Sequence, residues 1–143
     1  MRAAGTLLAA AAFTAPPAHA DLNSRGRVCG AIAVTSPDQP RVRSSFSARK
    51  TLDLQLRMQL GMRDGNMHVV NFQVVTPKGH VYQEIQVVQG ASTKKSVANI
   101  SARLPVAGTQ IATSSLYGQW RIVPYLDGGS RPCAAAAVFT VVR

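Results

Sequence analysis

The clearest pattern in the chain is LDLQLRMQL, residues 52–60. Leu or Met occupies every second position of this run, and a polar or charged residue occupies each position between them. Successive side chains of a β-strand point to opposite faces of the sheet, so a period of two predicts a strand. One face of this strand is apolar and the other is polar, which is typical of a sheet that covers a hydrophobic core on one side.

Shorter patterns of the same kind occur along the rest of the chain, separated by segments rich in turn-forming residues. Together with the run above they give seven predicted strands: 28–34, 52–60, 69–75, 81–88, 97–104, 118–126 and 135–142. Pro77 and Gly79 predict a tight turn that joins the third and fourth of these strands in a hairpin. About seven short strands in a chain of this length predict an all-β protein built as an antiparallel β-sandwich.

The last part of the chain carries more specific expectations. We expect residues 105–115 to be irregular, because they are rich in Gly, Thr and Ser. Trp120 in the sixth predicted strand is expected in the core, since tryptophan is highly buried on average. Pro124 cannot donate a ladder hydrogen bond, so its segment is expected to be an edge strand or to contain a bulge. In the last predicted strand, alternate residues from Ala135 to Val141 are expected to point inward.

The first twenty residues have the three parts of a secretory signal peptide. Arg2 supplies a positive charge, Ala3–Ala12 is apolar, and Ala18 and Ala20 form the small-x-small site that signal peptidase reads. We therefore predict a signal peptide over residues 1–20 and a single β-sandwich domain over residues 21–143. The composition is typical of bacteria, so the expected location is the periplasm or the extracellular medium. The rest of the chain offers no apolar segment of transmembrane length.

The two cysteines, Cys29 and Cys133, lie near the two ends of the predicted mature domain. In an oxidising compartment an even pair of cysteines predicts a disulfide. This bond would close a loop of about 100 residues and would place the first and last strands next to each other. The alternative is a pair of free, buried thiols.

The chain is strongly basic, with a formal net charge of +10, of which Arg2 leaves with the signal peptide. This charge favours an anionic partner such as lipopolysaccharide, an acidic glycan or another anionic envelope surface. The groups that we single out as anion contacts are Arg41, Arg43, Lys94 and Lys95. The basic residues are scattered and form no run of the length that marks a dedicated nucleic-acid site. The alternative is that the charge only keeps the protein in solution.

The sequence shows no catalytic, cofactor-binding or metal-binding set of residues. His68 and His80 flank the predicted hairpin and could meet across it, but a metal site would need further ligands at a recognisable spacing. Two separate surface histidines are the simpler interpretation. Asp64 and Asp127 stand in predicted turns, where aspartate has a structural role. We therefore expect no cofactor and no enzymatic activity.

The C-terminal part of the chain resembles the last hairpin of bacterial immunoglobulin-like modules. The resemblance rests on LYGQWRI at 116–122, Leu126-Asp127-Gly128, and a closing strand that ends at Phe139-Thr140-Val141. It covers about 28 residues and implies an immunoglobulin-like antiparallel β-sandwich. It implies no activity, since sandwich modules carry many different functions. The chain departs from antibody-type domains because no tryptophan follows shortly after Cys29.

These features favour an exported, non-enzymatic binding or structural module that acts through protein interaction. Modules of this type bind through the loops at their ends or through an exposed edge strand. The end loops are predicted at 36–40, 63–66, 90–95 and 108–115. One alternative function is electrostatic binding of an anionic envelope surface, glycan or lipopolysaccharide, and another is that of a small secreted enzyme inhibitor. The sequence does not name the protein partner.

Overall fold

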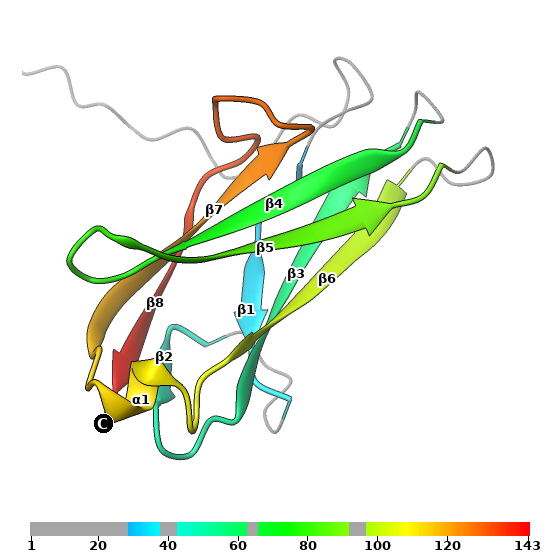
Figure 1. The fold of residues 1–143 in the computed structure, drawn as a ribbon. Helices are drawn as coiled ribbons and strands as arrows, with labels where there is room; N and C mark the ends of the chain where they lie inside the picture. Colours follow the sequence, from blue (N-terminus) through cyan, green and yellow to red (C-terminus); the bar gives the residue numbers. More distant parts are fainter. Residues whose placement is uncertain (1–28, 38–42, 63–65, 92–96) are drawn as a thin grey trace, which may run out of the picture.

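The computed structural model describes residues 29–37, 43–62, 66–91 and 97–143, and these residues form an all-β sandwich (Figure 1). The elements in chain order are β1 (Ala33–Thr35), β2 (Ser45–Ser47), β3 (Asp53–Gly61), β4 (His68–Val75), β5 (Val81–Gln89), β6 (Val97–Pro105), α1 (Gln110–Thr113), β7 (Gly118–Leu126) and β8 (Ala137–Val142). The predicted fold class is therefore confirmed, with eight strands among the described residues in place of seven. The predicted signal peptide and its cleavage site at Ala18 and Ala20 lie outside the described residues.

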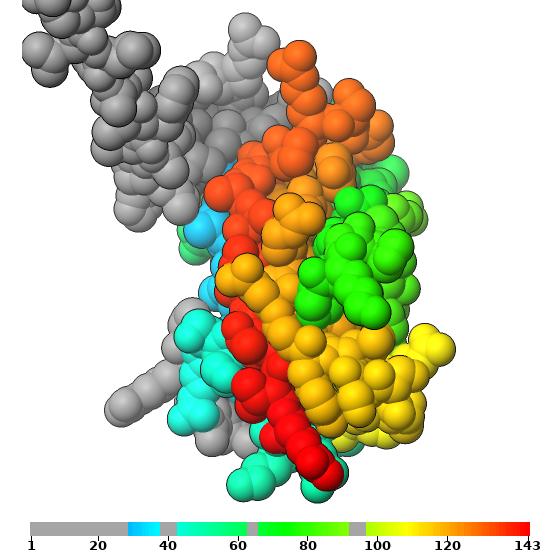
Figure 2. Space-filling view, turned by 90° about the vertical axis from the view of Figure 1, so that its left-hand side faces the viewer, coloured from blue at the N-terminus to red at the C-terminus, as the bar shows by residue number. Residues whose placement is uncertain are grey.

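The strands form two sheets. β1, β3 and β6 form a three-stranded sheet in the order β1-β3-β6, and the other strands form a five-stranded sheet in the order β2-β8-β7-β4-β5. All neighbours are antiparallel except β2 and β8, which are parallel. In Figure 1, β4 and β5 cross over the strands of the other sheet. Figure 2 shows β8 running along β7, with the segment around β2 on its other side.

The core lies between the two sheets and is built from every second residue of the long strands. The buried apolar side chains of β3 are Leu54, Leu56, Met58 and Leu60, as the alternation in 52–60 predicts. Leu52 is the exception, with 65% of its surface exposed, because the strand begins only at Asp53. Burial of such side chains is the main term that stabilises a sandwich of this size.

Trp120 is fully buried at the centre of the aromatic part of the core, as predicted. Its ring stacks on Phe139 with centroids 6.3 Å apart, and Tyr82 meets it edge-on at 5.4 Å. The indole Nε1 donates a hydrogen bond of 2.9 Å to the carbonyl oxygen of Leu116. The ring therefore has aromatic packing partners, and its N–H has a hydrogen-bond acceptor.

The prediction for Pro124 needs correction. β7 lies between β8 and β4, so it is a central strand and not an edge. The irregular pairing in this sheet lies in β4, at Val74/Val75. Proline is tolerated because the pairing of β7 with β8 ends at Ile122–Ala137, two residues before Pro124. The side of β7 that faces β8 is thus a local edge at this position.

Three further differences concern short segments. β2 was not predicted, since it contains three residues of which only Phe46 is buried. α1 lies in the segment predicted to be irregular, where the Thr109 hydroxyl caps the helix by accepting from the Ile111 N–H at 3.3 Å. At the other end of the chain Ala135 is exposed, because β8 begins two residues later; Phe139 and Val141 point inward as predicted.

Candidate functional site

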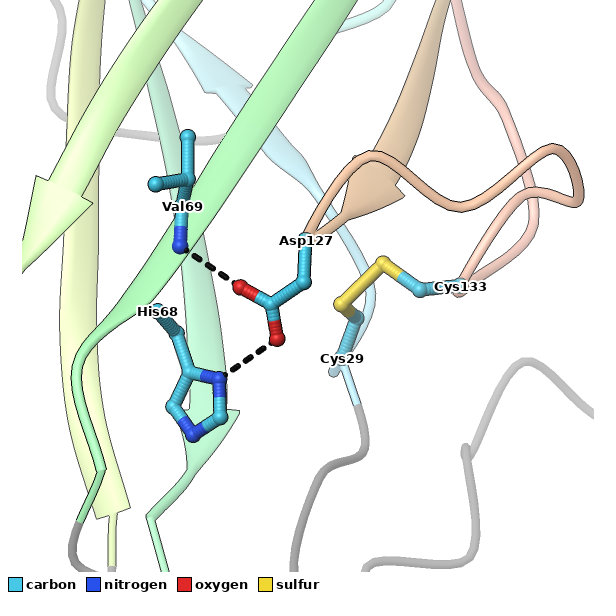
Figure 3. Close-up of a disulfide and its surroundings, with 5 residues drawn as sticks. All are labelled: Cys29, His68, Val69, Asp127 and Cys133. Carbon is cyan, nitrogen blue, oxygen red and sulfur yellow. Dashed lines mark hydrogen bonds and ion pairs between the residues drawn. A yellow bond between two sulfur atoms is a disulfide. The ribbon is translucent and has the colours of Figure 1, made fainter.

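The predicted disulfide between Cys29 and Cys133 is present, with Cα atoms 5.6 Å apart (Figure 3). Cys29 precedes β1 and forms an isolated bridge with Leu60 of β3. Cys133 lies in the connection between β7 and β8. Its backbone N–H donates to the carbonyl oxygen of Pro124. The disulfide therefore joins the three-stranded sheet to a loop of the five-stranded sheet.

A histidine–carboxylate pair lies beside this disulfide (Figure 3). Asp127 directly follows β7 with a positive φ of 50°, and its carboxylate reaches the start of β4. One oxygen lies 2.7 Å from Nδ1 of His68, and the other accepts a 2.9 Å hydrogen bond from the Val69 N–H. The Asp127 N–H in turn donates to the Val69 carbonyl oxygen. These contacts join β7 to β4, so Asp127 has a structural role, as its turn position predicts.

The two histidines do not meet. His68 begins β4, whereas His80 lies in the turn that follows the other end of this strand. His68 is only 2% exposed, so the prediction of two surface histidines is wrong for His68 and right for the exposed His80. The described part of the chain holds no group of three or more His, Cys, Asp or Glu side chains that could bind a metal ion.

The edge strand β5 is the longest open edge of the five-stranded sheet. It has nine residues and pairs only with β4 among the described strands. Every second residue of an edge strand directs its N–H and C=O away from the sheet, where they can pair with another chain. Val81 and Val88 are 52% and 61% exposed, and Glu84 is the only charged residue of the strand. β5 contains no lysine or proline, which natural edge strands use to prevent pairing.

A hollow of about 260 Å³ lies beside β5 on the outer face of the same sheet. Its walls include Gln73 and Glu84, whose side chains share a 3.3 Å hydrogen bond, and Tyr125 of β7. Asn71 also lines the hollow, and its Oδ1 is buried without a hydrogen-bond partner. An acceptor in this state is costly until a donor reaches it. The Glu84 carboxylate is an acceptor that this hollow presents to a side chain that donates hydrogen bonds.

Of the predicted anion contacts, the structure describes Arg43; Arg41, Lys94 and Lys95 lie outside the described residues. Arg43 is exposed and lines a small hollow of about 130 Å³ together with Lys50. The remaining lining residues are Ser36, Ser45, Phe46, Ser47 and Thr51. Two cations and several hydroxyl groups surround this hollow, and its lining contains no carboxylate.

The sequence predicted the strand β5 but not its position at an edge. The order of strands depends on pairings between distant parts of the chain, which alternation of residue types does not encode. The low charge of residues 81–89 is the signal that could have indicated an open edge or an interface.

No protein-family model matches this chain. No curated protein matches it either. In the part of the chain that the structure describes, no helix has the length and apolar character needed to cross a membrane.

Proposed function

We propose that the chain is an exported, non-catalytic binding module that takes up an extended segment of a partner protein at the edge of β5. The open edge of this strand carries the proposal. Strand addition supplies main-chain hydrogen bonds along the edge, and pockets for alternate side chains supply specificity. The predicted signal peptide and the disulfide support an exported location.

The hollow beside β5 supports a preference for a particular kind of segment. The carboxylate of Glu84 and the side-chain amide of Gln86 line this hollow and belong to β5 itself. A partner side chain that donates several hydrogen bonds, such as arginine or glutamine, fits these acceptors. Val81 and Val88 supply apolar contact area near the two ends of the strand.

The order of the strands supports an immunoglobulin-like module. In immunoglobulin domains one sheet contains strands A, B and E and the other contains G, F and C, to which variable domains add C′. β1, β3 and β6 take the places of A, B and E, while β8, β7, β4 and β5 take those of G, F, C and C′. In this assignment the proposed edge is strand C′.

The proposal is tested by capture of partners from an envelope extract of the source cells with the oxidised, exported protein, washed at low and then at high salt. A protein partner that survives high salt is the expected result. Two single variants, Gln86→Pro and Val87→Pro, test the edge. Adjacent residues of a strand point their N–H groups to opposite sides, so one proline breaks the pairing with β4 and the other removes an unpaired amide at the edge.

The variant whose proline removes an unpaired amide at the edge is expected to fold but no longer to capture the partner. The variant whose proline breaks the pairing with β4 is expected to have a lower melting temperature. Capture that is equal for the wild type and for the folded proline variant would contradict the proposal. A discrete dimer in size-exclusion chromatography that the same proline abolishes would show that β5 pairs with a second copy instead.

A second candidate function is electrostatic binding of an anionic envelope surface, and the hollow between Arg43 and Lys50 favours it. The double variant Arg43→Gln/Lys50→Gln is expected to weaken binding to lipopolysaccharide vesicles and to reduce the salt dependence of binding, by analogy with the loss of phosphate contacts in nucleic-acid complexes. The matched control is Arg121→Gln/Arg131→Gln, which removes the same charge at two other exposed positions. Equal losses in the two double variants would show that only net charge matters.

A further inference from the structure

The outer face of the three-stranded sheet carries a hollow with a volume of about 560 Å³. It lies on the opposite sheet from β5 and is separate from the proposed protein-binding edge. Arg57 of β3 stands in it, with Ala33 of β1 opposite on one side and Ser101 of β6 opposite on the other. Because both cross-strand neighbours are small, space remains open around the guanidinium group.

Two side-chain hydrogen bonds position Arg57. Its Nη2 donates to Oε1 of Gln55 at 2.9 Å, and Nε2 of Gln55 donates to Oγ of Ser101 at 3.1 Å. Residues two apart on a strand lie on the same face, so this chain of bonds runs across the surface of the sheet. The bond to Gln55 uses one of the five N–H donors of the guanidinium and leaves the others for a ligand.

The charge of Arg57 is not neutralised by the sheet. Asp53 is the only acidic residue of β1, β3 and β6, and its carboxylate pairs with Arg103. The lining of the hollow therefore has one cation, three side-chain amides, one hydroxyl group and no carboxylate. An arginine fork of this kind matches the geometry of a carboxylate or phosphate group.

We propose that this hollow binds an acidic saccharide, with Arg57 pairing with its carboxylate or phosphate group. Asn99 and Ser101 line the same hollow and can exchange hydrogen bonds with sugar hydroxyls. The volume is in the range of small-ligand sites, about 300–1,000 Å³. The lining has no aromatic ring, which argues against a nucleobase, since single nucleotides are held by stacking.

The test is a titration of the ¹⁵N-labelled, oxidised, exported protein with glucuronate, glucose 1-phosphate and glucose, followed by NMR. The side-chain signals of Arg57 and Asn99 are expected to shift with a charged sugar and not with glucose. The charged sugar that binds more tightly identifies the oxyanion. Equal shifts with acetate or inorganic phosphate alone would show that the hollow does not recognise the sugar. No shift with either charged sugar would show that the hollow is not a binding site for an acidic saccharide.

Variants separate this site from the general positive charge of the protein. Arg57→Gln is expected to weaken the binding of the charged sugar at least about tenfold, since a hydrogen bond to a charged group is lost. Arg121→Gln removes the same charge from an exposed position on the other sheet and should leave the affinity unchanged. Ala33→Glu places a carboxylate beside Arg57 and should abolish binding, whereas Ala33→Gln controls for side-chain size. Equal weakening by Arg57→Gln and Arg121→Gln would contradict the proposal, and none of these outcomes depends on capture of a protein at β5.

Discussion

Asp127 contacts the buried imidazole of His68 through a distance of 2.7 Å between Oδ2 and Nδ1. This contact joins the end of β7 to the start of β4, next to the disulfide. β4 is also the strand on which β5 pairs, and His68 itself stands opposite Gln89 of β5. The position of the proposed binding edge therefore depends on how firmly β4 is held.

Asp127→Ala is expected to lower the free energy of unfolding by about 2–4 kcal/mol, because two hydrogen bonds are lost and alanine is disfavoured at a positive φ. Asp127→Asn should cost less, since asparagine accepts this backbone conformation and can still accept from the Val69 N–H. Urea unfolding of the oxidised proteins measures both changes. An Asp127→Ala variant as stable as the wild type would show that the pair contributes nothing.

Removal of the disulfide is expected to destabilise the protein by about 2–5 kcal/mol, because the bond closes a long loop in the unfolded chain. The two cysteines are 104 residues apart in the sequence. The measurement is the urea midpoint of the wild type with and without a reductant. A Cys29→Ala/Cys133→Ala variant serves as the control, since the reductant should not change its midpoint; an unchanged wild-type midpoint would contradict the prediction.

Gly118→Ala should destabilise the protein more than Gly108→Ala. Both glycines have a positive φ, of 130° and 75°, so alanine is strained at either position. A Cβ atom at position 118 would also lie 3.0 Å from Cβ of Pro77, whereas the space around position 108 is open. Thermal melting of the two variants compares them directly, and a larger loss for Gly108→Ala would show that the crowding at Pro77 is not real.

Trp120→Phe is expected to cost about 2–3 kcal/mol, since it leaves a small cavity and removes the donor to the Leu116 carbonyl. Tyr125→Phe, on the outer face of the same strand, is the matched control and should change the stability by less than about 0.5 kcal/mol. Circular dichroism during urea unfolding follows both variants. Similar losses for the two would mean that Trp120 has no special place in the core.

Alternation of residue types predicted the long strands, because each has one face in the core and one in water. In β3 the buried Leu54 and Leu56 alternate with the more accessible Gln55 and Arg57, and this periodicity is visible in the sequence. β2 has three residues and α1 has four, which is too short for any period to stand out. The disulfide was predictable because the predicted signal peptide indicates an oxidising compartment and two cysteines allow only one pairing.

The candidate sites were not predictable in the same way. The hollow around Arg57 arises where Ala33, Arg57 and Ser101 meet across three strands that are distant in the sequence. The buried His68 resembled a surface residue, because its partner Asp127 stands 59 positions further along the chain. Strand order and register decide which distant residues come into contact, and both depend on the whole fold.

Site-specific photo-cross-linking from β5 in the source cells tests most directly whether this strand binds a partner protein. A photoreactive phenylalanine analogue is placed at Gln86 on the exposed edge strand and, as a control, at the exposed Thr113 of α1. We expect a discrete protein adduct from position 86 and none from position 113. Adducts from position 113 alone, or no adduct from either position, would contradict a function in protein binding through β5.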